Sequence, residues 1–283
     1  MNQTYENILT DRPARGIFRI TLNRPNKRNA LGNYLRRDLF AALEAADVDS
    51  DVRVTVIRGA GSCFSAGYDL GADLSKDLAF HSAGGAGYWA RHAAEGCFRI
   101  WDLAKPVIAQ VHGYCLAGGT ELAASCDLVY VADDAQIGYP AVRSISPPDN
   151  QFYPWVIGMR RAMEMMLTGD SISGQQAAEW GFANASFPLA ELESQVLRMA
   201  ERVAKIPPDI QQINKRAVHR QMEAMGMRNG IRAGTELQAL SLQTASHIAW
   251  TTKAQTEGIK SALNERDGAF GDYRTSDTER TTE

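Results

Sequence analysis

Alternating apolar and polar positions near the start of the chain predict a β-strand over residues 16–23, GIFRITLN. Residues 31–49 then carry apolar side chains at helical spacing, which predicts an amphipathic helix. Further strands are predicted where Val, Ile and other apolar residues cluster, over residues 52–60, 106–113 and 126–133. A helix is expected over 88–103. Strands separated by helices predict an α/β core with parallel strands.

The second part of the chain changes from mixed to helical patterning. Residues 173–181, SGQQAAEWG, begin with a capping-box pattern and end in glycine, as short helices do. Amphipathic helices are predicted over 189–206, 209–225 and 232–249. We therefore expect an α/β core over 1–190 and a C-terminal helical region over 191–283, ending in a polar, disordered tail over 274–283.

Composition narrows the class of protein. The 283 residues are 45% hydrophobic and 22% charged, with a net charge of −3 and no long basic run. This balance argues against nucleic acid or an anionic membrane as the main partner. No apolar run approaches membrane-spanning length and the first residues lack the apolar core of a signal peptide, so a cytoplasmic protein is expected. The spacing of Cys63, Cys97, Cys115 and Cys126 favours buried reduced thiols and no metal site.

Two glycine-containing segments carry the candidate chemistry. Residues 63–70, CFSAGYDL, lead from a strand end through small residues and a glycine into an acid-led segment, and residues 115–122, CLAGGTEL, lead from a strand through glycines into a helix expected to start near Gly119. Missing side chains let the backbone approach a ligand, and the first N–H groups of a helix have no partner within it. Two such N–H groups aimed at one oxygen would form an oxyanion hole. Taken singly, each segment is more often an ordinary strand-to-helix turn.

Together the two segments resemble those of the crotonase superfamily, which includes enoyl-CoA hydratases and isomerases. The resemblance extends to ITLNRPNKRNALG (20–32), to residues 105–140, to GMRRAMEMMLTGDSISGQQAAEWG (158–181) and, more loosely, to 257–273. It implies a ClpP/crotonase-like fold of repeated β-β-α units with a C-terminal helical region. It also implies an acyl-CoA substrate, no cofactor other than the CoA of the substrate, and a homotrimer or dimer of trimers.

The resemblance assigns roles to residues of this chain. The backbone N–H groups of Tyr68 and Gly118 would form the oxyanion hole for the thioester oxygen. Lys27 or Arg28 would contact the CoA phosphates. A solvated turn explains the presence of these two residues equally well. The residues expected around CoA are Lys27, Arg28, Ala30, Ala66, Asp69, Leu70 and Phe270.

One acidic residue matches the family and another departs from it. Hydratases of the family use two glutamates that hold one water; the first matches Glu121, whereas the position of the second is Ala141. Asp149 lies eight residues later, where dienoyl-CoA isomerases carry an aspartate that resembles the proton donor. Glu121 could instead be a helix-stabilising acid in a first turn, and Asp149 a helix N-cap or turn residue.

We therefore expect an enzyme with Glu121 and Asp149 as catalytic residues, which most readily hydrates a 2-enoyl-CoA to a 3-hydroxyacyl-CoA. An enoyl- or dienoyl-CoA double-bond isomerase is the first alternative. A CoA-ester hydrolase, a C–C lyase and a weakly catalytic CoA-ester-binding protein are the others. Dehalogenation is disfavoured because Ala141 stands where those relatives carry tryptophan.

Overall fold

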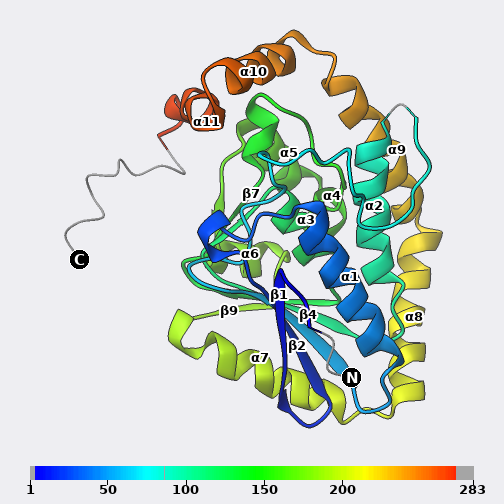
Figure 1. Cartoon of the computed structure of the whole chain (residues 1–283). Helices are drawn as coiled ribbons and strands as arrows, with labels where there is room; N and C mark the ends of the chain where they lie inside the picture. Colours follow the sequence, from blue (N-terminus) through cyan, green and yellow to red (C-terminus); the bar gives the residue numbers. More distant parts are fainter. Residues whose placement is uncertain (1–3, 86, 272–283) are drawn as a thin grey trace.

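A six-stranded sheet forms the centre of the computed structural model, which describes residues 4–85 and 87–271 (Figure 1). Its strand order is β1-β2-β3-β4-β6-β9, with β1 and β2 antiparallel and all later neighbours parallel. The strands are β1 (Ile8–Ala14), β2 (Ile17–Leu22), β3 (Val54–Gly59), β4 (Val107–Val111), β6 (Leu128–Ala132) and β9 (Ala185–Phe187).

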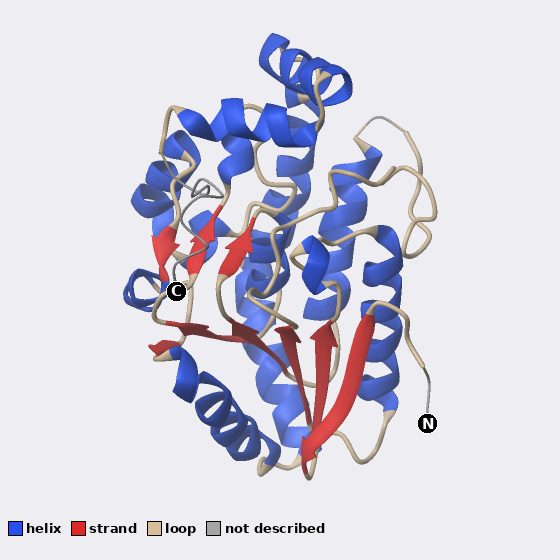
Figure 2. Cartoon of the chain, turned by 60° about the vertical axis from the view of Figure 1, so that its left-hand side comes forward, coloured by secondary structure: helices blue, strands red, loops and turns tan. Residues whose placement is uncertain are grey.

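Burial on both faces explains the apolar composition of the central strands. Ile20 of β2 is paired with Ile57 of β3, and both side chains are fully buried. Helix α1 (Asn33–Val48) contacts β1 and β2, whereas α7 (Leu189–Ala204) contacts every strand from β1 to β4 and β6 and β9. Figure 2 shows α7 on the opposite side of this sheet from most of the other helices. Parallel strands covered by helices on both faces are typical of α/β proteins.

A second, three-stranded sheet carries the glycine-containing segments. It consists of β5 (Tyr114–Leu116), β7 (Gln136–Gly138) and β8 (Ile172–Ser173), and in Figure 2 its short strands lie to one side of the large sheet. An isolated bridge joins Ser65 to Cys115 beside β5, and helix α3 (Gly118–Ala124) begins directly after that strand. The two segments that the sequence analysis selected are thus neighbours in space.

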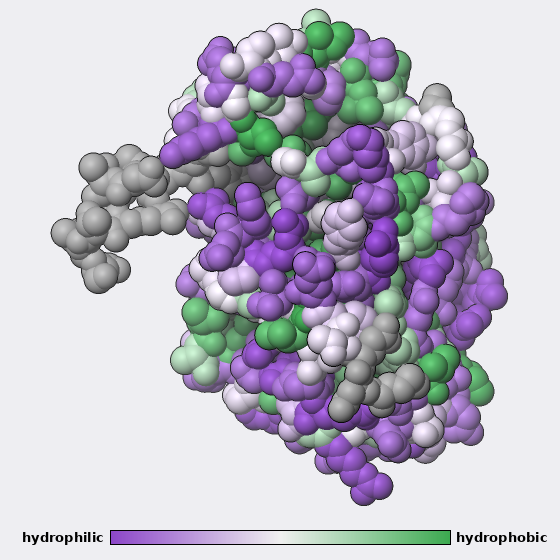
Figure 3. Space-filling view, viewed as in Figure 1, coloured by the Kyte–Doolittle hydropathy of each residue, from purple (hydrophilic) through white to green (hydrophobic). Residues whose placement is uncertain are grey.

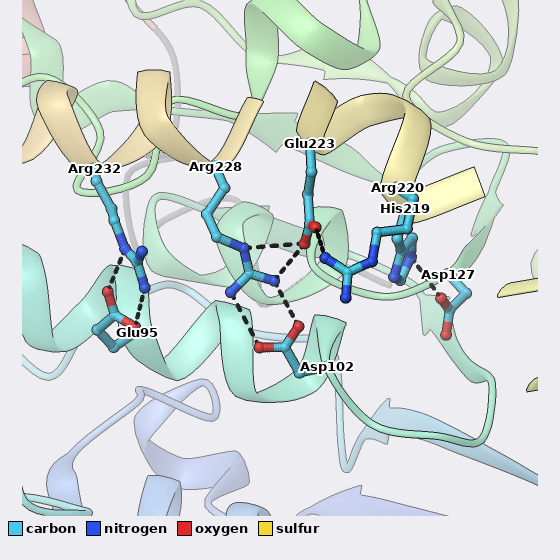
Figure 4. A network of polar contacts seen from close by, with 8 residues as sticks. All are labelled: Glu95, Asp102, Asp127, His219, Arg220, Glu223, Arg228 and Arg232. Carbon is cyan, nitrogen blue, oxygen red and sulfur yellow. Dashed lines mark hydrogen bonds and ion pairs between the residues drawn. The ribbon is translucent and has the colours of Figure 1, made fainter. Parts of the chain in front are cut away.

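Helix α9 (Met227–Ser241) packs against α2 (Tyr88–Trp101) and against α8 (Pro208–Ala224). Figure 4 shows how arginines of α9 reach α2 and its end: Arg232 pairs with Glu95, and Arg228 with Asp102. The Arg232–Glu95 pair has an Nε–Oε1 distance of 2.7 Å, and a second nitrogen of Arg232 reaches Oε2 at 2.9 Å. Such two-pronged contacts hold α9 in a defined position along α2.

The remaining helices complete the frame. They are α4 (Tyr153–Val156), α5 (Gly158–Thr168), α6 (Gly174–Trp180), α10 (Ala245–Thr256) and α11 (Ile259–Gly268). Arg143, at the end of a short 3-10 helix, is buried and pairs with Asp267 of α11 and with Asp170. Arg143 therefore has a structural role, because its ion pairs connect the 3-10 helix to α11 and to Asp170. Within the described ranges, no helix is both long and apolar enough to cross a membrane.

The sequence predicted most of the main elements of this fold and missed the smaller ones. The single helix predicted over 232–249 is wrong, because α9 ends at Ser241 and a new helix, α10, is capped by Thr244. The predicted strand over 126–133 shortens to β6, and the capping box at Ser173 is present, with Gln176 as its partner. Strands β1, β5, β7 and β8 are short or exposed on one side, and were not predicted. The division at residue 190 stays a prediction; helix α7 spans this position and packs on the large sheet. The predicted disordered tail lies outside the described residues.

Candidate active site

A cavity of about 490 Å³ lies between the glycine-containing segments and the C-terminal helices. Its volume is in the range of small-molecule sites. All but one of the residues expected around CoA line it, as do Tyr68, Ala141 and Asp149 of the expected catalytic region. These CoA-site residues are Lys27, Arg28, Ala30, Ala66, Asp69 and Leu70.

Phe270 is the exception among the residues expected around CoA. The structure places its side chain half-exposed, with the Arg143 guanidinium 3.8 Å from the ring centre, and does not bring it to the cavity. Arg266 and Asp267, a few residues earlier, do line it. Asp69 is held by Arg24 at 2.8 Å, so its carboxylate supports the loop that shapes the cavity wall.

The two glycine-containing segments are packed so closely that a side chain at Gly67 would collide with the neighbouring segment. A Cβ atom at Gly67, where φ is +102°, would lie 2.9 Å from the Cβ of Ala117 and 3.2 Å from the backbone N of Gly118. Neither the N–H of Tyr68 nor that of Gly118 donates a hydrogen bond within the described residues. Two backbone donors without a partner thus lie on adjacent segments, as an oxyanion hole requires.

Glu121 is buried in α3 and accepts four hydrogen bonds. Its Oε2 accepts from the Tyr68 hydroxyl at 2.7 Å and from Asn150 Nδ2 at 2.8 Å. Its Oε1 accepts from the Tyr139 hydroxyl at 3.0 Å and from the Asn150 backbone N–H at 3.2 Å. Burial raises the pKa of Glu121, and these donors oppose that rise by stabilising the carboxylate.

Asp149 is buried equally deeply but lacks such donors. Its side chain lines the cavity, and Oδ1 has no hydrogen-bond partner among the described residues. Burial, and then the negative charge of Glu121, raise the pKa of Asp149 well above its usual value, while Arg36 lowers it. Both pKa values are raised, and that of Asp149 is raised more strongly because no donor stabilises its carboxylate, so Asp149 is the more readily protonated of the two. Two acids whose environments give them different pKa values are a common basis for acid–base catalysis.

The side chain of Tyr68 has a role that the sequence analysis missed. Only its backbone N–H was expected to act, yet its ring lines the cavity and its hydroxyl contacts Glu121. The ring lies over the start of α3, so close that a Cβ atom at Gly118 would be 2.7 Å from it. Glu121 itself does not line the cavity, and the Tyr68 and Tyr139 rings, which both do, connect it to that space.

Arg36 is a second residue that the sequence analysis missed. Its guanidinium is buried, forms no ion pair within the described residues, and lies 5.8 Å from the Tyr68 ring centre and 5.2 Å from that of Trp89. Burial lowers the pKa of Arg36, and the nearby Tyr68 and the acids of the site oppose this. A signal was available: Arg36 falls on the same face of its helix as Phe40 and Leu43, where an apolar residue is normal.

Other candidates have packing roles. His92 is buried and stacks on Phe80, with ring centres 4.2 Å apart, and its Nδ1 is 2.9 Å from the Ser82 hydroxyl. Burial lowers the pKa of His92 to about 4, so the ring is neutral at physiological pH. All four cysteines are buried and free, as predicted. The described residues contain no cluster of side chains suited to a metal ion.

Comparison with known proteins identifies the family. A model of the enoyl-CoA hydratase/isomerase family matches residues 12–272. The 2,3-dehydroadipyl-CoA hydratase of Escherichia coli K12 is 34% identical over 258 residues, which cover 90% of this chain and 94% of the relative. The chain therefore belongs to the enoyl-CoA hydratase/isomerase family, whose substrates are acyl-CoA thioesters.

Solved structures confirm the fold. An enoyl-CoA hydratase/isomerase from Xanthobacter autotrophicus Py2 is similar with a TM-score of 0.86 and 33% identity, over 94% of this chain and 99% of the other. An enoyl-CoA hydratase from Mycobacterium smegmatis has the same TM-score at 30% identity, over 95% and 96% of the two chains. The predictions of the family, of the crotonase fold and of an enzyme of this family are thus confirmed.

Proposed function

We propose that this protein hydrates a 2-enoyl-CoA to the 3-hydroxyacyl-CoA. The observation that carries the proposal is the pair of buried carboxyl groups, Glu121 with four hydrogen-bond donors and Asp149 without them, whose proton affinities are therefore unequal. Hydration needs a base that accepts a proton from water and an acid that donates a proton to C2, and such a pair supplies both.

The thioester oxygen would accept hydrogen bonds from the N–H groups of Tyr68 and Gly118. Addition of water at C3 turns the thioester into an enolate, and negative charge develops on that oxygen. Donors fixed by backbone packing stabilise this charge without reorganising. The close packing of Gly67 against Ala117 supports this assignment, because it fixes the two donors relative to one another.

The proton transfers would divide between the two acids. Water gives its hydroxyl to C3 and its proton, through the Tyr68 hydroxyl, to Glu121. Asp149 gives its proton to C2. The proton on Glu121 then returns to Asp149, which restores the starting state with one water consumed. In this scheme Asp149 has the catalytic role that a glutamate at position 141 would have.

CoA would bind along the wall formed by Lys27, Arg28, Ala30, Ala66, Asp69 and Leu70, which line the cavity. Lys27 and Arg28 are the cations available for its phosphates. No cofactor other than the CoA of the substrate is part of this proposal.

A double-bond isomerase is the second candidate function. Of the two proposed catalytic acids, Asp149 lines the cavity, whereas Glu121 lies behind the tyrosine rings. One carboxyl group that removes and returns a proton is sufficient for isomerisation, which needs no water.

Substitution of Glu121 by Gln tests the hydratase proposal. Glu121→Gln keeps the size of the side chain but removes the charge that accepts the proton, so turnover of crotonyl-CoA should fall by about 10²-fold or more. Glu44→Gln, a change of an exposed glutamate in α1, is the control and should retain activity. Undiminished hydration by Glu121→Gln would remove Glu121 from the mechanism.

We also propose the trimeric or hexameric assembly and the cytoplasmic location expected from the sequence. Exposed hydrophobic side chains of the C-terminal helices support an assembly; they include Ile210, Ile213, Leu237, Leu240 and Ile248. In Figure 3, green hydrophobic residues interrupt the hydrophilic surface at the top of the view, where Figure 1 places α10. Sedimentation of the purified protein would measure the number of subunits.

A further inference from the structure

Gln238, in α9, lines the cavity with a polar atom that has no partner. Its side chain is 4% exposed, and its Oε1 accepts no hydrogen bond from any described residue. A buried amide oxygen without a donor costs about 1–3 kcal/mol. Such a group at a cavity wall is expected where a bound molecule supplies the donor.

Helix α9 brings this amide to the cavity that Asp149 also lines. One turn before Gln238, a Cβ atom at Gly234 would lie 2.6 Å from the Gln151 side chain. Beyond α9, His247 Nδ1 lies 3.0 Å from the carbonyl oxygen of Ile145. This part of the chain thus runs along the segment 145–151, and Gln238 of α9 and Asp149 of that segment line the same cavity.

Aromatic residues line the same cavity as Gln238. The next residue, Ala239, contacts Gly87 at the start of α2, and Trp89 follows in the first turn of that helix. Trp89 packs edge-on against Tyr68, with ring centres 5.2 Å apart, and both rings line the cavity. An acyl group in this space would meet aromatic rings along its body and the Gln238 oxygen at a polar point.

We propose that Gln238 binds a hydroxyl group on the acyl part of the substrate, so that the enzyme prefers hydroxyl-bearing acyl-CoA thioesters to purely hydrocarbon ones. This rests on the proposed function, because it names the substrate class for the same site. A hydroxyl supplies the donor that Gln238 Oε1 lacks. A carboxylate is disfavoured there, since it offers no donor and would be repelled by the charge shared by Glu121 and Asp149.

Binding of unreactive, saturated thioesters tests the inference separately from catalysis. Matched pairs of straight-chain acyl-CoA and terminally hydroxylated acyl-CoA of rising length, and phenylpropanoyl-CoA with its ring-hydroxylated counterpart, would be measured by calorimetry. We expect the hydroxylated member of at least one pair to bind about ten- to a hundredfold more tightly to the wild-type protein. Equal affinities in every pair, or tighter binding of carboxylated analogues, would overturn the inference even if the enzyme hydrates crotonyl-CoA.

Substitution assigns the preference to one side chain. Gln238→Met keeps the volume and removes the amide, so the preference should fall to less than threefold. Gln211→Met is the matched control, since Gln211 Oε1 is also buried without a partner but Gln211 does not line the cavity; it should keep the preference. A preference that survives Gln238→Met contradicts the assignment. So does an equal loss of turnover by Gln238→Met on hydroxylated and plain enoyl-CoA substrates, which would indicate that Gln238 holds the reacting water.

Discussion

The hydroxyl of Tyr68 donates a hydrogen bond of 2.7 Å to Oε2 of Glu121. Glu121 is thereby connected to a cavity that it does not line, through a ring that does. The backbone of Tyr68 and its side chain have separate proposed tasks: the N–H binds the thioester oxygen, and the hydroxyl passes a proton to Glu121.

Removing the Tyr68 hydroxyl should slow the reaction without weakening binding. Tyr68→Phe keeps the backbone donor and the ring but breaks the connection to Glu121, so kcat should fall by about 10²-fold with little change in KM. Steady-state kinetics with crotonyl-CoA measures both. Tyr34→Phe, which removes an exposed hydroxyl bonded to Asp77, is the control. Unchanged kcat in Tyr68→Phe would exclude proton transfer through this hydroxyl.

Adding a methyl group at Gly118 should damage the oxyanion hole. The new Cβ would lie 2.7 Å from the Tyr68 ring, so either the ring or the start of α3 must move. Loss of one oxyanion donor costs about 10²–10³-fold in kcat in comparable enzymes, and we expect Gly118→Ala to lose about that much. Gly84→Ala, where a Cβ would meet nothing within 4 Å, should retain full activity. An active Gly118→Ala enzyme would argue against Gly118 as a donor.

Asp149→Asn should stabilise the protein at neutral pH and not at acidic pH. The folded state raises the pKa of Asp149 above its unfolded value of about 4, so the folded protein binds the proton more tightly. The free energy of unfolding of the wild type therefore falls as pH rises from the pKa of Asp149 in the unfolded state toward its pKa in the folded state. The loss is about 1.4 kcal/mol for each unit by which folding raises this pKa. Asparagine does not ionise, so the variant does not lose this stability as pH rises.

Thermal unfolding at acidic and at neutral pH would measure this effect. The melting temperature of Asp149→Asn should exceed that of the wild type only at the higher pH, while hydration is lost. Asp134→Asn, a change of an exposed aspartate, serves as the control. An equal difference at both pH values would contradict a protonated Asp149.

Arg36 should set the upper pH limit of activity. Its positive charge lowers the pKa of Asp149, so Arg36→Met should raise that pKa. Because Asp149 must be protonated to supply the proton for C2, activity falls as pH rises through its pKa, and the variant should remain active to higher pH. The pH profile of kcat measures the shift. Arg37→Met, a change of the exposed neighbour, should leave the profile unchanged; a shift in both variants, or in neither, would contradict the role of Arg36.

Particular residues explain how far the sequence could predict this site. Glu121 was found from its place after the glycine-containing segment, because the backbone geometry of such a motif depends on residue type, and Asp149 was found from the resemblance of its loop to that of dienoyl-CoA isomerases. The roles of Tyr68, Asn150 and Gln238 depend on side chains that meet only after folding. Gln238 lies 117 residues from Glu121 in the sequence, on a helix whose pattern gives no sign of a cavity. Phe270 shows the opposite error, since a matching position did not bring the side chain to the cavity.

Isotope incorporation tests the hydratase proposal most directly. Crotonyl-CoA would be incubated with the wild-type protein in water labelled in both oxygen and hydrogen, and the acyl products would be analysed by mass spectrometry. The account predicts labelled oxygen at C3 and one solvent hydrogen at C2 in 3-hydroxybutyryl-CoA. Solvent hydrogen in an isomerised enoyl-CoA without labelled oxygen would contradict hydration and favour the isomerase, and recovery of unlabelled crotonyl-CoA would contradict both.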